Sequence, residues 1–332
     1  MNPIAEFRKM PRFPVLDGWR GISILCVLAA HMLPLGPKSW MLNDTFAAVG
    51  MSIFFTLSGF LVTTTLIYYP SVVDFAIRRC LRILPLAWLF LALVLPFSFV
   101  GYEYYFPNFL FYANFPPFPL LPVSAHLWSL GVEMQFYLGI AVLFLLLRKK
   151  GLLLLPLLCL AVTMNRFYHG EPLPQIVTYF RADEILSGAF LAIIVEGYLG
   201  RWLPRMIRRF DTYLWLLLLL LACHPRLELL NYFRPYCAAI LVGTTLLQEH
   251  TPFLTVLKAH WLAYTAKISF ALYIIHPLTT HGWFDDSDKL VKYAKRPLSI
   301  VLTLVLAHVS TFYYEKYWID LAKRLTNSHR TN

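Results

Sequence analysis

Long uncharged runs, separated by short polar and charged segments, follow one another along almost the whole sequence. A helix that crosses a membrane needs about 20 largely apolar residues, and shorter helices are possible when flanking Lys and Arg side chains reach the headgroups. We therefore expect a single all-α, polytopic membrane domain over residues 1–332, because such helices use the whole chain. The uncharged runs predict ten transmembrane helices, at residues 16–35, 46–69, 83–102, 127–147, 151–165, 183–200, 211–223, 233–248, 265–282 and 298–315.

The composition excludes both a soluble globule and a disordered chain. Apolar residues make up 58% of the sequence and charged residues only 14%, whereas a soluble domain carries roughly 25% charged residues. Disordered chains are poor in aromatic residues, which account for 16% here. We expect a multi-pass protein of the cytoplasmic (inner) membrane, with the lipid bilayer as its surroundings.

The net charge of +11 follows from the topology and does not indicate a nucleic-acid partner. Basic residues lie in short clusters between the apolar runs, and loops on the cytoplasmic side of membrane proteins carry an excess of Lys and Arg. With the amino terminus in the cytoplasm, the inside segments hold most of the 29 basic residues, including the clusters at residues 8–12, 78–82, 148–150 and 201–209. This predicts that both termini are cytoplasmic.

The first predicted helix carries three ionisable residues, Asp17, Arg20 and His31, and the last two lie eleven residues apart. At about 100° per residue, this spacing places both on one face, with an axial separation of about 16 Å. Ionisable residues inside membrane helices are rare and are candidates for function. The alternative is that Arg20 reaches the headgroups and His31 bonds a backbone carbonyl.

Arg78, Arg79 and Arg82 lie within five residues, just before the third predicted helix. Such a cluster is an ordinary topology signal, and it is equally typical of a phosphate-binding site, since Arg donors fit phosphate oxygens. In the second predicted helix, Ser58 and Gly59 interrupt bulky residues, which favours close helix packing.

The fourth predicted helix opens with His126 and Trp128 and contains Glu133. A carboxylate buried in a membrane helix needs a partner or a proton. Glu133 would either orient a histidine or form a salt bridge with Arg181. Asp183 begins the sixth predicted helix, and for His276 in the ninth we expect a structural role. The five cysteines show no Cys-x-x-Cys spacing, so no metal site is predicted.

Between residues 104 and 125 the chain has no charged residue but five prolines and many aromatic residues. Prolines prevent a long helix here. Because irregular backbone at membrane depth must be covered by protein or line a cavity, we expect this loop to fold back over the outer face of the bundle.

Five segments together resemble the membrane-bound acyltransferase family known as acyltransferase type 3, whose members O-acylate sugars, and they occur in that family's order over residues 14–318. Met134 and Phe270 depart from the pattern, where an acid and a tyrosine are common. The resemblance is to the stand-alone form, without a following esterase-like domain. The segments are LDGWRG with the Arg-x10-His spacing of Arg20 and His31, FFTLSGFLV, RRCLRILP with Arg79 and Arg82, AHLWSLGVEMQFY, and ISFALYIIHPL.

The resemblance implies an O-acyltransferase with no permanently bound cofactor, which uses acetyl-CoA or another acyl-CoA as co-substrate. It also implies a sugar or glycoconjugate acceptor at the outer face. We expect His31 to act as the general base, with an acyl-histidine intermediate as the alternative, and Glu133 to fix its tautomer. The donor would be bound by Arg20, Arg78, Arg79 and Arg82, and the acceptor by His126, Trp128 and Asp183.

Two other classes of function remain open at this stage. A transporter or flippase for a polar solute or glycolipid would move its substrate without consuming acyl-CoA. A structural membrane protein would tolerate substitution of His31 and Arg79. Slow hydrolysis of acetyl-CoA by the purified protein would argue against both.

Overall fold

The computed structural model describes residues 11, 13–118, 120–249, 251–285 and 288–331, and this part of the chain is helical, without a β-strand. The predicted inside cluster Arg8, Lys9 and Arg12 lies outside the described residues. The five longest α-helices are α1 (Pro14–Met32), α2 (Leu42–Tyr68), α3 (Val72–Val94), α5 (Trp128–Gly151) and α14 (Lys289–Val309).

The shorter helices connect and surround these five. The α-helices are α4 (Tyr105–Phe109), α6 (Leu155–Tyr168), α7 (Asp183–Val195), α8 (Trp202–Arg208), α9 (Thr212–Cys223), α10 (Glu228–Asn231), α11 (Arg234–Leu247), α12 (Pro252–Leu257), α13 (His260–Ile275) and α15 (Lys316–Thr331). A π-helix, Ser310–Glu315, joins α14 to α15. Short 3-10 turns lie at Lys38–Trp40, Pro96–Ser98, Tyr102–Tyr104, Ala125–Leu127, Leu152–Leu154, Thr178–Phe180, His276–Thr279 and Gly282–Phe284.

Each of the ten predicted membrane segments overlaps a helix, and the all-α class is confirmed for the described residues. Within those residues, five helical stretches are long and apolar enough to cross a membrane, and α9 and α11 are shorter apolar helices. A count of ten spans and the cytoplasmic side of the termini therefore stay predictions. The five stretches are Pro14–Met32, Leu42–Tyr68, Val72–Ser98, Ala125–Tyr168 and Lys289–Thr326.

The outward faces of α5 and α6 are apolar, as a lipid-facing surface requires. Leu138, Leu146 and Leu157 are exposed to 68%, 76% and 63%. A contiguous apolar surface of this kind is not stable in water, whereas it matches the hydrocarbon core of a bilayer. The protein is thus a multi-pass membrane protein.

Helix α3 begins eleven residues before the predicted boundary at residue 83, so that boundary is wrong. Ser71 caps the helix by accepting a hydrogen bond from the Asp74 backbone N–H at 3.2 Å. A search for uncharged runs begins after the last arginine, but arginine is a good helix former. The arginine cluster consequently lies within α3 and not in a loop before it.

Close packing of α2 against α7 depends on two glycines. A Cβ atom on Gly59 would lie 1.8 Å from the Ile185 carbonyl oxygen, and one on Gly188 would lie 1.9 Å from the Thr56 carbonyl oxygen. Only hydrogen fits at either position, so the two backbones approach each other closely. The prediction that Gly59 serves helix packing is confirmed.

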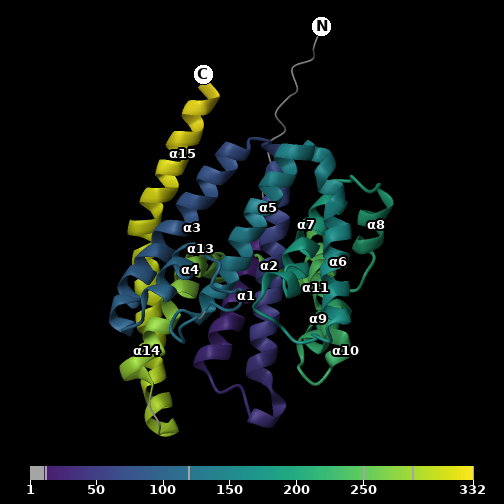
Figure 1. Ribbon diagram of the computed structural model, residues 1–332. Coiled ribbons are helices and arrows are strands. Elements are labelled where there is room, and N and C mark those ends of the chain that lie inside the picture. Colours follow the sequence, from purple (N-terminus) through teal and green to yellow (C-terminus); the bar gives the residue numbers. More distant parts are fainter. Residues whose placement is uncertain (1–10, 12, 119, 250, 286–287, 332) are drawn as a thin grey trace.

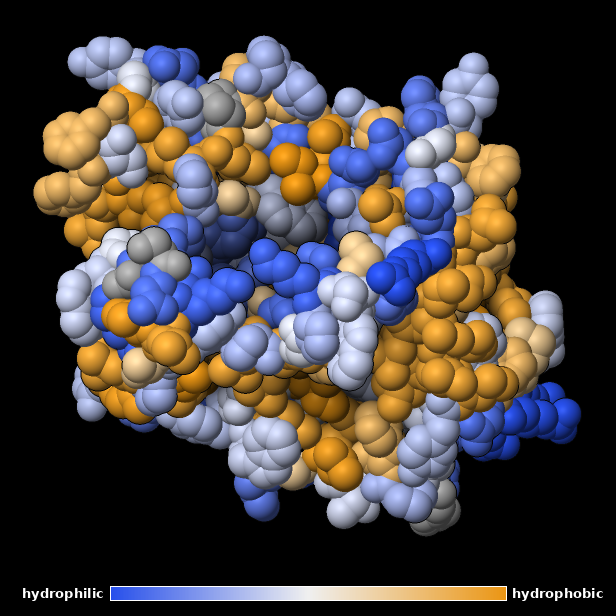
Figure 2. All heavy atoms as spheres, turned by 90° about the horizontal axis from the view of Figure 1, so that it is seen from below, coloured by the Kyte–Doolittle hydropathy of each residue, from blue (hydrophilic) through white to orange (hydrophobic). Residues whose placement is uncertain are grey.

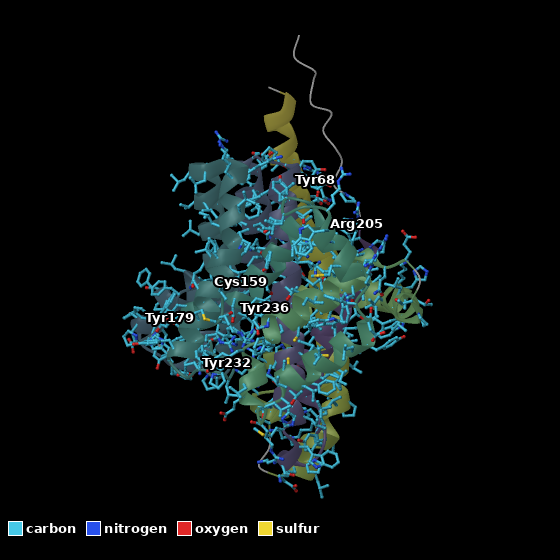
Figure 3. All side chains as sticks on the ribbon, turned by 90° about the vertical axis from the view of Figure 1, so that its right-hand side faces the viewer. Tyr68, Cys159, Tyr179, Arg205, Tyr232 and Tyr236 are labelled. Carbon is cyan, nitrogen blue, oxygen red and sulfur yellow. The ribbon has the colours of Figure 1, made fainter. Side chains whose placement is uncertain are left out.

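The start of α1 and the end of α15 lie at one end of the bundle, which we call the terminal end (Figure 1). The connection between α1 and α2 and the start of α14 lie at the other end, called the opposite end. Tyr68 and Arg205 lie toward the terminal end (Figure 3). The proline-rich loop contributes Leu120, Pro122 and Ala125 to the wall of a cavity, which confirms that it folds over the bundle.

Candidate functional site

A small cavity of about 50 Å³ lies between α1, α2, α3, α5 and α13, and we call it the arginine cavity. Arg20, Arg79 and Arg82 line it, and among the described residues none of the three forms an ion pair. The Arg79 guanidinium lies over the Tyr137 ring, 5.4 Å from its centroid. Three unpaired guanidinium groups around one cavity favour binding of an anion.

Glu133 lies in the wall of the arginine cavity and not beside a histidine. Its Oε1 accepts a hydrogen bond from Ser58 Oγ at 2.6 Å and a second from the Tyr137 hydroxyl. Its charge interacts with Arg20 and Arg82 without touching them. Neither partner predicted for Glu133, His31 or Arg181, bonds it. Ser58 on α2 and Tyr137, one turn farther along α5, supply the hydroxyl donors instead.

Arg78 does not line the arginine cavity, so its assignment to the donor site is corrected. Its Nε and Nη2 donate hydrogen bonds to Thr326 Oγ1 at 3.1 and 2.9 Å. Arg78 lies near the start of α3, where α15 packs against it. Contact with α15 occupies this guanidinium, while Arg79 and Arg82 reach the cavity.

A larger cavity of about 950 Å³, the histidine cavity, lies nearer the opposite end of the bundle. His31, His126, Trp128 and His276 all line it. Seen from the opposite end, the surface is hollowed near its middle, with hydrophilic residues around the hollow and hydrophobic residues farther out (Figure 2). The structure thus brings His126 and Trp128 to the same cavity as His31.

The two cavities adjoin, because Val27, Met51 and Tyr273 line both. Val27 lies seven residues after Arg20 and four before His31. These spacings put Arg20, Val27 and His31 on one face of α1. The predicted common face of Arg20 and His31 is confirmed, and His31 faces a cavity and not the surrounding lipid.

His31 and His276 form a direct pair. His31 Nδ1 and His276 Nε2 are 3.0 Å apart, and the ring planes differ by only 7°. His276 Nδ1 lies 2.8 Å from the carbonyl oxygen of Tyr273. The expected structural role of His276 stays a prediction, because a buried, hydrogen-bonded imidazole fits it too. The two residues are 245 positions apart, so no local pattern pairs them, although the segment ISFALYIIHPL carried part of the family resemblance.

These bonds define the protonation of two neutral rings. A carbonyl oxygen only accepts, so His276 Nδ1 carries its proton and His276 Nε2 presents a lone pair. His31 Nδ1 must then donate to that lone pair, which leaves the lone pair of His31 Nε2 free. The imidazole of His31 is exposed to the cavity while His276 is buried.

His126 packs behind this pair. Its ring centroid lies 5.4 Å from that of His276 and 5.3 Å from that of Tyr273. Both of its ring nitrogens are buried without a hydrogen bond. Despite three adjacent imidazoles, no group of three His, Cys, Asp or Glu residues in the described chain has the arrangement of a metal site.

Asp183 does not line the histidine cavity, and its assignment to the acceptor pocket is corrected. Its Oδ2 lies 2.6 Å from Arg166 Nη1, and both side chains are 0% exposed. Thr163 donates a further hydrogen bond to the same oxygen at 3.3 Å. Cys159 and Tyr236 lie beside this ion pair at mid-height of the bundle (Figure 3). A buried carboxylate is stable only when paired, and Arg166 satisfies it inside the protein.

Arg181 forms part of a neighbouring ion cluster that supports the wall of the histidine cavity. Glu184 forms an ion pair with Arg181 at 3.2 Å, and its Oε1 accepts hydrogen bonds from Arg234 Nε at 2.5 Å and from Ser52 Oγ at 2.9 Å. The Arg181 guanidinium lies over the Trp128 ring, 5.2 Å from its centroid. The cluster therefore holds Trp128 in place from behind.

At the mouth of the histidine cavity, Lys292 pairs with Asp285 at 2.6 Å. The hydrogen bond from Lys292 holds the pKa of the Asp285 carboxyl below its usual range, and the charges of His281 and Arg296 lower it further.

Comparison with known proteins agrees with this architecture. Residues 13–315 match the model of the family named Acyl_transf_3, an acyltransferase domain. A protein of Listeria monocytogenes named "Peptidoglycan O-acetyltransferase OatA" is 30% identical over 216 residues, which cover 54% of this chain and 34% of that protein. A Bacillus subtilis protein named "Putative peptidoglycan O-acetyltransferase YrhL" is 29% identical over 220 residues, covering 54% and 33%.

The matched part of the chain spans only about a third of the length of these curated relatives. No solved structure matches the chain significantly. The family model nevertheless covers nearly all of the described helices, from the start of α1 to the end of the π-helix. The chain therefore belongs to the acyltransferase type 3 family, as its sequence segments predicted.

Proposed function

We propose that the protein is a membrane O-acyltransferase that moves an acyl group, most simply acetyl, from acyl-CoA to a hydroxyl of a sugar or glycoconjugate. The observation that carries this proposal is the position of the His31–His276 pair in a cavity that adjoins a cluster of unpaired arginines. The names of the relatives support an O-acetyltransferase and make peptidoglycan one candidate acceptor.

The arginine cavity suits the anionic end of an acyl-CoA. Arg20, Arg79 and Arg82 would bind its phosphate groups through charge-assisted hydrogen bonds. A cavity of about 50 Å³ holds only one or two water molecules, each of which takes about 30 Å³ in the liquid. The side chains around this cavity must therefore move apart when the donor binds.

The pantetheine arm of acyl-CoA would follow the face of α1 that carries Arg20 and His31. Arg20 and His31 are separated by about 16 Å along the helix, a distance that a long, slender thioester carrier spans. The carrier would pass Val27, Met51 and Tyr273, which line both cavities. Its thioester would then meet the acceptor beside His31.

His31 Nε2 would act as the general base. It removes the proton of the acceptor hydroxyl as the oxygen attacks the thioester carbonyl carbon, and the carbon–sulfur bond breaks as the tetrahedral intermediate collapses. The imidazolium then returns the proton to the departing thiolate, so free CoA leaves as its thiol. His276 Nε2 accepts from His31 Nδ1 throughout and stabilises the positive charge that develops on His31, the role that a carboxylate has in other catalytic histidine pairs.

The acceptor would occupy the histidine cavity, with Trp128 as a stacking surface for a sugar ring. His126 would support this wall through its packing against His276 and not through its own nitrogens. Glu133 would balance the charge of the arginine cavity and hold Ser58 and Tyr137 in place.

The distribution of basic residues supports an orientation with the terminal end in the cytoplasm and the histidine cavity toward the outside. The donor would then come from the cytoplasm and the acceptor from the outer face of the cytoplasmic membrane.

The test uses the full chain in proteoliposomes with radiolabelled acetyl-CoA and cell-envelope glycan, and it follows both glycan labelling and release of free thiol. His31→Ala should lower transfer by about 10²- to 10⁴-fold, the usual contribution of a general base. The matched control is His308→Ala, because His308 lies exposed on α14 and bonds only Tyr264. Transfer at the wild-type rate in His31→Ala contradicts the proposal, and solute movement without thiol release would favour a transporter.

A further inference from the structure

Arg296 on α14 is a buried arginine that has no ion-pair partner among the described residues. It is 5% exposed, and its Nε and Nη1 are shielded from solvent and form no hydrogen bond. Among the residues that the structure describes, no carboxylate forms an ion pair with it. Its side chain lines the histidine cavity.

The other deeply buried arginines each have an ion-pair partner, although Arg181 also leaves its Nε and Nη1 without a hydrogen bond. Arg166 pairs with Asp183, and both Arg181 and Arg234 pair with Glu184. A buried charge left uncompensated is strongly unfavourable, because its hydration is lost and nothing replaces it. Within the described chain, three buried arginines are thus paired with carboxylates, and the fourth, Arg296, is left without one at a cavity wall.

The two acidic residues of the described chain that line the same cavity, Asp285 and Asp44, do not supply the missing partner. Asp285 is hydrogen-bonded to Lys292 at 2.6 Å and interacts with Arg296 only through space. Asp44 also lines the cavity, but it is exposed and forms no ion pair within the described chain. No acidic residue of the described chain thus pairs with Arg296, which leaves a bound molecule to supply the counter-charge.

Arg296 lies to one side of the reacting centre. It also lines a second cavity of about 510 Å³, together with His31, Lys38 and Lys292, so it lies where this cavity meets the histidine cavity. It forms no hydrogen bond with His31 or His276. It is therefore placed to hold a part of the acceptor remote from the hydroxyl that is acylated.

We propose that Arg296 binds an anionic substituent of the acceptor, a carboxylate or a phosphate, so that the protein acylates acidic glycans or phosphate-bearing glycoconjugates. This inference rests on the proposed function. Arg donors match both anions in geometry and charge, and a site built to pair with a charged group discriminates strongly against analogues that lack it.

The first experiment compares cell-envelope glycan in three forms: native, with carboxylates converted to carboxamides, and with phosphates removed by phosphatase. The wild-type protein should acylate the native form about ten- to hundredfold faster than the form that lacks the recognised anion. In Arg296→Gln, the ratio of the rate with native glycan to the rate with glycan that lacks the anion should fall close to one. In the matched control Arg226→Gln it should persist, because Arg226 is exposed and bonds only the Ser39 carbonyl oxygen.

The second experiment needs no activity and measures the Tm of the purified protein in detergent at fixed ionic strength. Glucuronate or inorganic phosphate should raise the Tm of the wild type more than glucose does, because a ligand that binds the folded state stabilises it. Arg296→Gln should lose the shift with glucuronate and keep only the phosphate shift that the arginine cavity provides, because that cavity of about 50 Å³ is too small for a sugar acid. The Tm of Arg296→Gln without ligand should equal or exceed that of the wild type. Arg234→Gln should instead lower the Tm, since it strips Glu184 of a partner.

Equal rates with all three glycans in the wild type would overturn the proposal, as would an Arg296→Gln protein that keeps the wild-type preference. A low Tm of Arg296→Gln without ligand, like that of Arg234→Gln, would assign Arg296 a structural role instead. If the wild type acylates no glycan and consumes no acetyl-CoA, the proposed function fails, and the Tm shifts still decide whether Arg296 binds an anion.

Discussion

The hydrogen bond between His31 and His276 makes a specific prediction about the rate of acyl transfer. His276→Leu removes the atom that accepts the hydrogen bond from His31 Nδ1–H. The leucine side chain is apolar and has a similar volume. His276→Gln is the conservative variant, because the glutamine Oε1 can occupy the position of Nε2 and accept the same hydrogen bond. The pair of variants separates the loss of the acceptor from the loss of the ring.

The expected magnitude follows from the geometry. The bond is 3.0 Å long, and His276 is only 2% exposed, so water cannot replace it. Loss of one partner in a buried hydrogen bond costs about 1–3 kcal/mol. Since about 1.4 kcal/mol in the activation free energy is tenfold in rate, His276→Leu should lower the rate about 5- to 150-fold. The loss arises because His31 can then carry its proton on Nε2, where it cannot act as a base.

The assay is labelled acetyl transfer at saturating acceptor, with kcat and the KM for acetyl-CoA determined separately. His276→Leu should lower kcat and leave this KM close to the wild-type value, because the arginine cavity does not include His276. His276→Gln should recover most of kcat. A merely structural role would lower both parameters together with the Tm and would show no rescue by glutamine.

The reasoning is refuted if His276→Leu transfers at the wild-type rate. It is also refuted if the two variants lose the same kcat at an unchanged Tm, since the restored acceptor would then have no effect.

Three further variants test the remaining assignments. Arg82→Gln should raise the KM for acetyl-CoA about tenfold or more through the loss of charge-assisted bonds, whereas Arg78→Gln should not, and equal effects would contradict the assignment. Gly59→Leu should lower the free energy of unfolding, measured in detergent, by more than about 3 kcal/mol, because the backbone of Ile185 leaves no room for a side chain. Normal stability of this variant would contradict the packing of α2 against α7. Asp183→Asn should lower the free energy of unfolding by about 3–5 kcal/mol, because it leaves Arg166 unpaired. An altered acceptor preference at normal stability would instead place Asp183 in the acceptor pocket.

Much of the site was predictable because some of its determinants are local. The spacing of Arg20 and His31 fixes their common face through helix geometry alone, and the structure confirms it. Likewise, Gly59 in a run of bulky residues indicated close packing, which the contact with α7 bears out.

Apart from the start of α3, the wrong predictions share one cause, since each concerned the partner of a charged or polar side chain. Glu133 was expected beside His31 but bonds Ser58, and Asp183 was expected in the acceptor pocket but pairs with Arg166. A buried polar group bonds the nearest group that satisfies it, and that group usually lies far away in the sequence.

The sequence by itself determined the all-α class, the apolar segments and the face of α1 that carries Arg20 and His31, because hydropathy and helical periodicity act over neighbouring residues. Only the tertiary structure decided that His276 lies within hydrogen-bond distance of His31 and that Arg296 has no ion-pair partner in the described chain. Those facts depend on how α1, α13 and α14 pack together, and packing of distant segments is not written in the local pattern of any one of them.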